Sequence, residues 1–139
     1  MVTISTDPAL LDVDRVHRWL STDAYWALGR HRDVLERAIA GSLCFGAYDE
    51  SGQVGFCRLV TDRATFAWLC DVYIDPATRG RGVGISLMEA VDRELAGMQV
   101  GRAVLATADA HGLYARFGFA VMDQPERWML RRYDSPSSG

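Results

Sequence analysis

The chain has 139 residues, and its 15 basic and 18 acidic side chains give a net charge of −3. A chain of this length fits one domain with one hydrophobic core, and its charge balance gives no electrostatic reason to bind nucleic acid. No apolar run approaches the ~18 residues that a membrane-spanning helix needs, so no membrane association is expected.

The first half of the chain predicts a strand, two helices and three further strands. Apolar residues recur at helical spacing in two segments, residues 12–20 and 32–40, and Gly41 would end the second helix. A short strand is expected before them, and three strands separated by turn-forming residues are expected after them, over residues 2–5, 43–48, 54–60 and 65–74. The close spacing of the last three strands favours an antiparallel meander.

The second half of the chain is expected to alternate helices and strands. Val83, Leu87, Val91 and Leu95 recur every four residues, which predicts an amphipathic helix of about four turns. This helix would lead from the meander to a parallel neighbouring strand. The remaining predicted elements are a strand, a short helix that begins at Asp109 and ends at Gly118, and a last pair of strands, over residues 103–107, 109–118, 119–122 and 128–132.

The chain is expected to form one domain over residues 1–133, followed by a disordered tail over residues 134–139. Its three cysteines lie in hydrophobic runs and form no Cys-x-x-Cys pair, which favours buried, reduced thiols in a cytoplasmic protein. The N-terminus shows no secretory signal pattern. The histidines do not stand at ligand spacing to the cysteines, so no metal site is expected.

Three alternating glycines, Gly80, Gly82 and Gly84, lie between the third meander strand and the long helix, next to Arg79 and Arg81. The first amides of a helix have no partner within the helix, and the helix dipole favours an anion there. The loop is not a P-loop, because the chain contains no lysine, and the spacing of its glycines does not fit the dinucleotide-binding fingerprint. A phosphate-bearing ligand of another kind is therefore indicated.

The segment over residues 69–84, Leu-Cys-Asp-Val-Tyr-Ile-Asp-Pro-Ala-Thr-Arg-Gly-Arg-Gly-Val-Gly, closely resembles the acetyl-CoA-binding motif of the GNAT superfamily of N-acetyltransferases. That motif reads Gln/Arg-x-x-Gly-x-Gly/Ala after a strand, and Arg79, Gly82 and Gly84 match it. The predicted element order also matches the family, so the resemblance covers nearly the whole chain. It implies the α/β (α+β) GNAT fold, with a mixed, mostly antiparallel sheet flanked by helices and a strand–glycine loop–helix–strand site for acyl-CoA.

The resemblance also implies which residues bind acetyl-CoA. The main chain of Val72, Tyr73 and Ile74 would hold the pantetheine arm as an added strand. The CoA pyrophosphate would lie on the loop and the first helical turn, formed by Arg79, Gly80, Arg81, Gly82, Val83, Gly84 and Ile85. The alternative is a glycine-rich turn that only caps the helix, although three alternating glycines cost more backbone entropy than a plain cap requires.

A second segment, Tyr114-Ala115-Arg116-Phe117-Gly118-Phe119, resembles the family's Tyr-x-x-x-Gly-Phe segment. In many members this tyrosine donates a proton to the leaving CoA thiolate, which implies that Tyr114 is the general acid. The alternative is a tyrosine that only packs its ring in the core. Many members have an asparagine seven residues earlier, where this chain has Thr107, so a cofactor contact at Thr107 stays open.

The attacking amine must lose a proton, and Asp71, His111 or water could accept it. Asp71 precedes the pantetheine-binding segment, and its alternative is a salt bridge or a turn contact. His111, on the first turn of the tyrosine's helix, could act as this base or contact the amine in the acceptor pocket, and the alternative is a lone histidine with no role in the chemistry. Tyr25, Trp26 and Phe45 could line this pocket, and simple core packing is the alternative for them.

The resemblance therefore implies an acyltransferase that moves an acetyl group from acetyl-CoA to a primary amine. An acyl-CoA-binding or sensor module without catalysis is the alternative, and the retained Tyr114 favours the enzyme. A nucleotide-binding protein of another kind is disfavoured by the absence of lysine. The acceptor stays open between small-molecule and peptide amines, the donor between acetyl and longer acyl groups, and the assembly between a monomer and a homodimer.

Overall fold

A computed structural model of the chain describes residues 1–135. Five strands form one sheet whose spatial order follows the chain: β1 (Thr3–Ser5), β2 (Leu43–Asp49), β3 (Gly52–Thr61), β4 (Phe66–Ile74) and β5 (Arg102–Val104). The first four strands pair antiparallel, and β4 pairs parallel with β5. The expected mixed, mostly antiparallel sheet is therefore confirmed.

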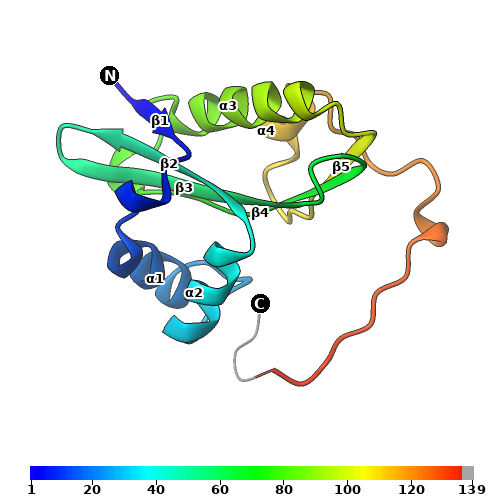
Figure 1. The fold of residues 1–139 in the computed structure, drawn as a ribbon, viewed down its shortest axis with the longest axis horizontal. Coiled ribbons are helices and arrows are strands. Elements are labelled where there is room, and N and C mark those ends of the chain that lie inside the picture. The colour runs from blue at the N-terminus through cyan, green and yellow to red at the C-terminus, as the bar shows by residue number, and fades with distance from the viewer. Residues whose placement is uncertain (136–139) are drawn as a thin grey trace.

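Helices cover both faces of this sheet (Figure 1). One face carries α1 (Val13–Thr22) and α2 (Arg32–Ala40), and the other carries α3 (Val83–Met98) with the short α4 (His111–Ala115) beside it. The sequence explains where the first two helices begin and end. The side chain of Asp12 accepts a hydrogen bond from the amide of Arg15 at the start of α1, and Gly41 follows the last residue of α2.

The sheet divides the core into two layers. Successive side chains of a strand point to opposite faces, so Phe45 packs beneath α3 while its neighbour Cys44 packs beneath α1 and α2. On β3, Leu59 belongs to the α3 layer and Phe56 to the other layer. The two layers hold α1 and α3 in place on opposite sides of β4.

Two irregularities of β4 shape the middle of the molecule. Arg58 of β3 pairs with Cys70, but Phe56 pairs with Tyr73, so β4 carries one extra residue and forms a bulge at Asp71, whose φ is 54°. The pairing of β4 with β5 runs from Phe66 to Trp68. The two strands therefore diverge before β4 reaches its glycine loop.

The expected last pair of strands, over residues 119–122 and 128–132, is wrong for this chain. The described residues after α4 contain no strand, only a single 3₁₀ turn over Pro125–Arg127. The backbone leaves the body of the molecule there (Figure 1), and a strand forms only where a neighbouring edge supplies hydrogen bonds. Strand β5 is also shorter than expected, because its pairing with β4 ends at Val104.

The start of α4 and the end of the chain also differ from the expectations. Asp109 does not cap α4, because the residue before this helix is Ala110. The Thr107 hydroxyl instead accepts hydrogen bonds from the amides of Asp109 and Ala110. Of the expected disordered tail, residues 136–139 lie outside the described residues, and residues 134–135 are exposed.

Candidate functional site

The N-terminus of α3 is built to receive an anion. Its N-cap, Gly82, has no side chain to cap the helix, and its first turn contains no acidic residue. The first hydrogen bond within the helix joins the amide of Ser86 to the Gly82 carbonyl at 3.0 Å. The preceding amides, of Val83, Gly84 and Ile85, therefore have no partner within the helix. These unpaired amides and the helix dipole favour a bound phosphate.

The loop before α3 depends on glycine at two positions. Gly80 and Gly82 have φ of 84° and 80°, in the left-handed region that other residues adopt only with strain. A Cβ added at either position would meet no atom within 4 Å, so the outer side of the loop is open. A phosphate can therefore approach the main chain closely, with the exposed Arg81 beside it.

Arg79 is held at the rim of this loop by the end of α1. Its Nε donates to the Ile74 carbonyl at 3.2 Å, and its Nη2 lies 3.7 Å from Asp23 Oδ2. Its guanidinium also lies 5.4 Å from the ring centre of Tyr73, whose hydroxyl donates to Asp23 Oδ2 at 2.5 Å. Burial and this hydrogen bond raise the pKa of Tyr73 to about 12. Asp23 thus orients Arg79 and Tyr73 together.

The divergence of β4 and β5 leaves the edge of β4 open beside the loop. Val72, Tyr73 and Ile74 lie beyond the last β4–β5 pair, Trp68 with Val104. On the other edge, Tyr73 and Ile74 pair with Phe56 and Gly55 of β3. An open strand edge offers main-chain donors and acceptors to an extended ligand.

Tyr114 lies on α4, close to the first turn of α3. A Cβ at Gly84 of α3 would lie 3.6 Å from Leu113, the residue before Tyr114, so the two helices meet at this point. The Tyr114 side chain is 8% exposed, and its ring stands edge-on to Phe119 at 6.3 Å. Burial, with smaller contributions from Cys57 and other acidic groups, raises the pKa of Tyr114 to about 12. Its hydroxyl therefore keeps its proton at neutral pH and can donate it.

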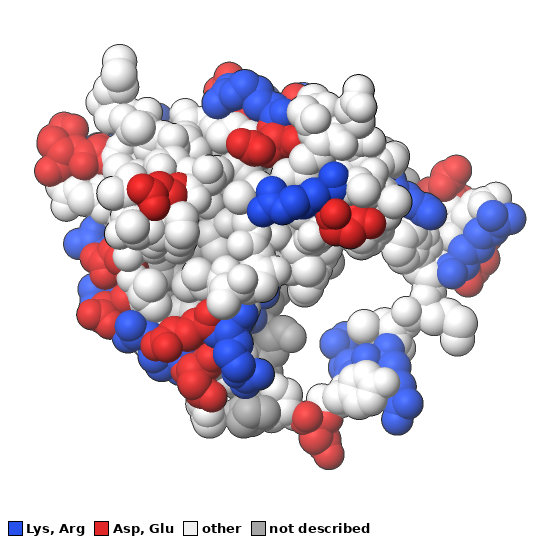
Figure 2. All heavy atoms as spheres, in the orientation of Figure 1, with Lys and Arg blue, Asp and Glu red and all other residues white. Residues whose placement is uncertain are grey.

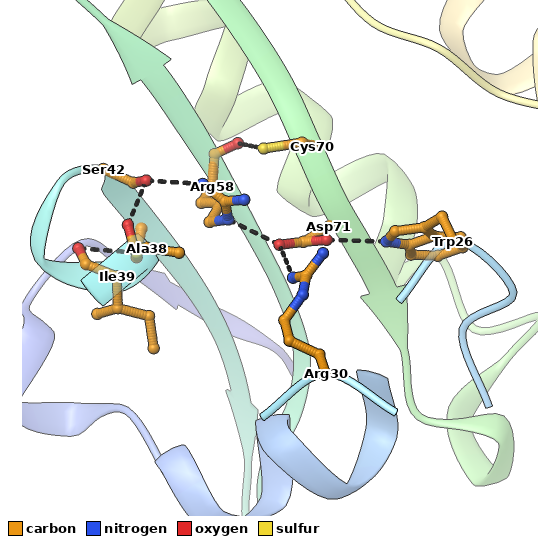
Figure 3. Close-up of polar contacts among 9 residues, drawn as sticks. Trp26, Arg30, Ala38, Ile39, Ser42, Arg58, Cys70 and Asp71 are labelled. Carbon is orange, nitrogen blue, oxygen red and sulfur yellow. Dashed lines mark hydrogen bonds and ion pairs between the residues drawn. The ribbon is translucent and has the colours of Figure 1, made fainter. Parts of the chain in front are cut away.

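Asp71 is the centre of a buried ion-pair network (Figure 3). Its Oδ2 accepts from Arg30 Nη1 and from Arg58 Nε, both at 2.7 Å, and its Oδ1 accepts from Trp26 Nε1 at 2.8 Å. Arg58 donates in turn to the Ser42 hydroxyl at 3.0 Å. Burial raises the pKa of Asp71, but Arg58 and Arg30 outweigh it and hold that pKa below its usual value. A carboxylate stabilised in this way is a weak proton acceptor.

The comparison with known proteins decides the family. Residues 40–121 match the family model described as the acetyltransferase (GNAT) domain. The chain belongs to the GNAT acetyltransferase family. An acetyltransferase-named protein of the GNAT family from Xanthomonas campestris is 46% identical in sequence, with a TM-score of 0.90 over 96% of this chain and 94% of that one. An acetyltransferase-named protein of Gibberella zeae is 35% identical over 133 residues, with 81% of this chain and 75% of that protein covered.

A more distant solved structure shares the fold. An acetyltransferase-named protein of Clostridium acetobutylicum, solved with acetyl-CoA, superposes with a TM-score of 0.71 over 95% of this chain and 96% of its own, at 14% identity. The GNAT fold expected from the sequence is therefore confirmed.

The residues expected around the acceptor lie in different environments in this GNAT domain. Tyr25 is half exposed, and its hydroxyl accepts a hydrogen bond from the amide of Ala108 at 3.0 Å. Trp26 stands edge-on to Tyr25 and is fixed by Asp71. His111 is exposed at the start of α4. Phe45 has no exposed surface and packs in the α3 layer, so it lines no pocket, and the core-packing alternative describes it.

Sequence reasoning missed three residues that contact the candidate site: Arg30 and Arg58 bind Asp71, and Asp23 contacts Tyr73 and Arg79. The sequence contained a signal for the ion pair between Arg58 and Asp71. Each of these residues interrupts a largely apolar strand, and a charge in a buried strand requires a partner. Nothing local pointed to Arg30, which lies in the connection between α1 and α2, or to Asp23, just after α1.

The cysteines and the other candidate ligands form no metal centre. Residues 1–135 contain no group of three His, Cys, Asp or Glu side chains placed to hold a metal ion. Cys44 and Cys57 are buried, as expected, and Cys70 is half-buried. Burial raises the pKa of Cys44 to about 11 and that of Cys70 to about 12, so these thiols stay protonated. No helix of residues 1–135 has the length and hydrophobicity required to cross a membrane.

Proposed function

We propose that this GNAT domain is an N-acetyltransferase that moves an acetyl group from acetyl-CoA to a primary amine. One observation carries the proposal: Gly84 in the uncapped first turn of α3 lies against both Ile74 at the end of β4 and Leu113, the neighbour of the largely buried Tyr114. The three features supply an anion site, an extended binding edge and a proton donor. The Clostridium acetobutylicum protein of the same fold, solved with acetyl-CoA, supports the choice of donor.

The chain's own groups fit CoA in this arrangement. The pyrophosphate would bind the amides from Gly80 to Ile85, with charge supplied by Arg79 and Arg81. The pantetheine arm would lie along Val72–Ile74 as an added strand. A ligand bound in this way has its thioester end directed away from the loop, along the gap between β4 and β5.

The reaction is a direct transfer. The amine nitrogen attacks the acetyl carbonyl carbon, the C–N bond forms and the C–S bond breaks. The Tyr114 hydroxyl donates its proton to the departing sulfur. The proton of the attacking amine passes to water or to His111, which are both open candidates. The Asp71 carboxylate accepts three hydrogen bonds and its pKa is lowered, so we do not assign it the role of base. We assign it a positioning role instead: it fixes Trp26 and the connection between α1 and α2.

A screen of primary amines with thiol release from acetyl-CoA tests the proposal. The panel contains amino acids, polyamines, aminoglycosides, amino sugars and peptides with free N-termini or lysines. Amine-dependent thiol release, with the acetylated amine identified by mass spectrometry, is the expected result. Tight CoA binding with no turnover on any amine would support the binding module instead, and an absence of CoA binding would overturn the whole assignment.

A further inference from the structure

The buried network around Asp71 contains more positive than negative charge. Arg30 and Arg58 both donate to Asp71 Oδ2 at 2.7 Å, so two guanidinium groups share one carboxylate. The side chains of Arg30 and Arg58 are 7% and 10% exposed, and that of Asp71 is 2% exposed. Within residues 1–135, Asp71 is the only acidic side chain in ion-pair contact with either arginine. A buried charge requires an opposite charge beside it, and one carboxylate balances only one of the two arginines.

The other contacts of Arg58 reduce this excess of positive charge but do not remove it. Its Nη1 donates to the Ser42 hydroxyl at 3.0 Å, and that hydroxyl donates to the Ala38 carbonyl in the last turn of α2 at 2.6 Å (Figure 3). The C-terminal end of a helix carries only about half a negative charge. On the surface, by contrast, side chains of both signs are mixed over α1 and α2 (Figure 2). The unbalanced charge therefore belongs to the buried network.

Several N–H groups of these two arginines are free to bind an anion. The hydrogen bonds of the network use Arg30 Nη1 and Arg58 Nε and Nη1, so Arg30 Nε and Nη2 and Arg58 Nη2 have no partner within residues 1–135. In the same part of the chain, the Tyr48 hydroxyl is the only fully buried polar side-chain atom without a partner, so these three nitrogens reach solvent. Guanidinium groups bind carboxylates through paired N–H groups, so a carboxylate is the anion that fits best.

The network lies next to the gap between β4 and β5, along which the thioester of acetyl-CoA would be directed. Arg58 of β3 pairs with Cys70 of β4, so the two side chains lie on the same face of the sheet, the one that carries α1 and α2. The pairing of β4 with β5 ends at Trp68, so the other edge of β4 at Cys70 borders the gap. Neighbouring strands lie ~4.8 Å apart, so only about one strand separates Arg58 from the gap. A small acceptor can therefore hold its amine at the gap and an anionic group at Arg58.

An exposed aromatic surface adjoins the network. Trp68 is 43% exposed, and the Arg58 guanidinium lies 6.0 Å from the centre of its ring. With Val60, Phe66 and Val104, Trp68 lines a hollow on this side of the sheet. An apolar side chain of the acceptor would be removed from water there, while a carboxylate beside it contacts Arg58.

We propose that the acceptor of this GNAT domain is an amino acid with an apolar side chain, whose carboxylate binds Arg30 and Arg58. The inference rests on the proposed N-acetyltransferase function and adds the chemical class of the amine. The carboxylate supplies the negative charge that the network lacks, and the side chain lies on Trp68. The transfer forms the C–N bond of an N-acetyl amino acid and breaks the C–S bond of acetyl-CoA. Of the two protons that the ammonium form loses, one ends on the CoA sulfur and one in solvent.

Phenylalanine, phenylalaninamide and 2-phenylethylamine share one side chain and differ in the carboxylate. Thiol release from acetyl-CoA gives kcat/KM for each compound, expressed per concentration of neutral amine. Phenylalanine should exceed both analogues by about 10-fold or more, because both lack the charged hydrogen-bond acceptor. Leucine, its amide and 3-methylbutylamine repeat the comparison with a smaller side chain. Equal or faster turnover of the analogues without a carboxylate would overturn the inference and leave the proposed acetyltransferase function intact.

Arg58→Met removes one guanidinium group and keeps a long side chain. It leaves Asp71 paired with Arg30 alone, which is a balanced pair, and circular dichroism checks that the fold is kept. The preference for phenylalanine over 2-phenylethylamine should fall by about 10-fold or more, and this ratio does not depend on the folded fraction. Arg37→Met is the matched control, because Arg37 is 73% exposed on α2, and it should keep the preference. An unchanged preference in the folded Arg58→Met protein would contradict the proposal.

Binding of compounds that lack the amine tests the carboxylate site without any reaction. 3-Phenylpropanoate and 3-phenylpropanamide are titrated by calorimetry into the wild-type chain, with and without CoA. The carboxylate should bind more tightly than the amide by about 10-fold or more. If it does so while no amine is acetylated, the carboxylate site stands and the proposed enzyme activity does not. Equal affinity for the two compounds, or binding of neither, would show that the inference is wrong.

Discussion

Asp71 is a charged residue in the interior, and its environment determines what it can do. Its side chain is 2% exposed and contacts two guanidinium groups, so the charges offset one another. Removing one partner of such a buried network leaves uncompensated charge, which costs more than the network itself contributes. The partners of this carboxylate, and not its residue type, therefore decide whether it can act as a base or only stabilises the fold.

Asp71→Asn is expected to lower the free energy of unfolding by about 3–5 kcal/mol, because Arg30 and Arg58 would stay buried without their counter-ion. Urea unfolding followed by circular dichroism measures this loss. Asp33→Asn is the control: Asp33 is exposed, and its replacement should change stability by less than about 0.5 kcal/mol. A fully stable Asp71→Asn protein with abolished turnover would return Asp71 to the role of base.

The Asp71 network should also make stability depend on pH. The carboxyl has a lower pKa in the folded chain than in the unfolded chain, so its contribution is complete above the unfolded value near ~3.9 and is lost as pH falls through the folded value. The stability difference between wild type and Asp71→Asn should therefore be constant from about pH 5 to 8 and decrease below about pH 4. A difference that instead decreases between about pH 5 and 7 would contradict the lowered pKa.

Tyr114→Phe removes the proposed proton donor and keeps the ring that packs against Phe119. The turnover rate should fall by about 100-fold or more, while CoA affinity stays within a few fold. Steady-state kinetics and calorimetric CoA binding provide the two readouts. Tyr48→Phe, which removes a hydroxyl from a half-buried tyrosine of β2, should leave both unchanged. Near-normal turnover of Tyr114→Phe would reduce Tyr114 to a packing residue.

At the scale of elements, the site depends on how closely α3 approaches the sheet. Gly55 of β3 lies directly beneath α3, and a Cβ there would come within 3.1 Å of Val83 and 3.2 Å of Leu87. The absence of a side chain at Gly55 sets the first turn of α3 against β3, and the anion site moves with that turn. The packing between sheet and helix thus positions the loop relative to the open edge of β4.

Gly55→Val should cost about 1–3 kcal/mol of stability and weaken CoA binding, because the added atoms displace the start of α3. Gly97→Ala, within α3 itself, is the contrasting variant: a Cβ there meets nothing within 4 Å, and it should stabilise α3 by up to about 1 kcal/mol without affecting CoA binding. Thermal unfolding and CoA titration measure both. If the Gly55→Val protein is destabilised but keeps its CoA affinity, the packing of α3 on β3 does not position the anion site.

Gly82→Asp tests the anion site at the start of α3. The introduced carboxylate would lie where the unpaired amides receive the pyrophosphate, so we expect CoA affinity to fall by about 100-fold or more. Gly82→Ala introduces the same left-handed strain without the charge, and it should weaken binding much less. Equal losses in the two variants would mean that backbone geometry, and not charge, governs binding.

At the scale of the whole molecule, ligand and fold should be linked. A ligand that binds only the folded chain stabilises it by mass action, by about 2.7 kcal/mol at a concentration 100 times its Kd. Millimolar CoA should therefore raise the melting temperature of the wild type, and the increase should be lost in Gly82→Asp. Melting temperatures that do not respond to CoA would show that the chain binds it weakly or not at all.

Much of the fold was already determined by the sequence, because helix periodicity, strand length and turn composition act locally. The bounds of α2 agree with the prediction, and those of α1, β2, β3 and β4 agree closely with it. The glycine loop was also predictable, since a left-handed backbone at Gly80 and Gly82 favours one residue type. The phosphate side of the candidate site could therefore be predicted from a short, continuous segment.

Only the tertiary structure decided which distant groups meet. The bulge at Asp71 and the packing of α1 and α2 bring Arg30, Arg58 and Trp26 to one carboxylate, and no local pattern encodes that contact. The same holds for residues 128–132, which the sequence predicts as a strand. A strand, unlike a helix, takes its hydrogen bonds from another segment, so its formation depends on where a free edge lies in three dimensions.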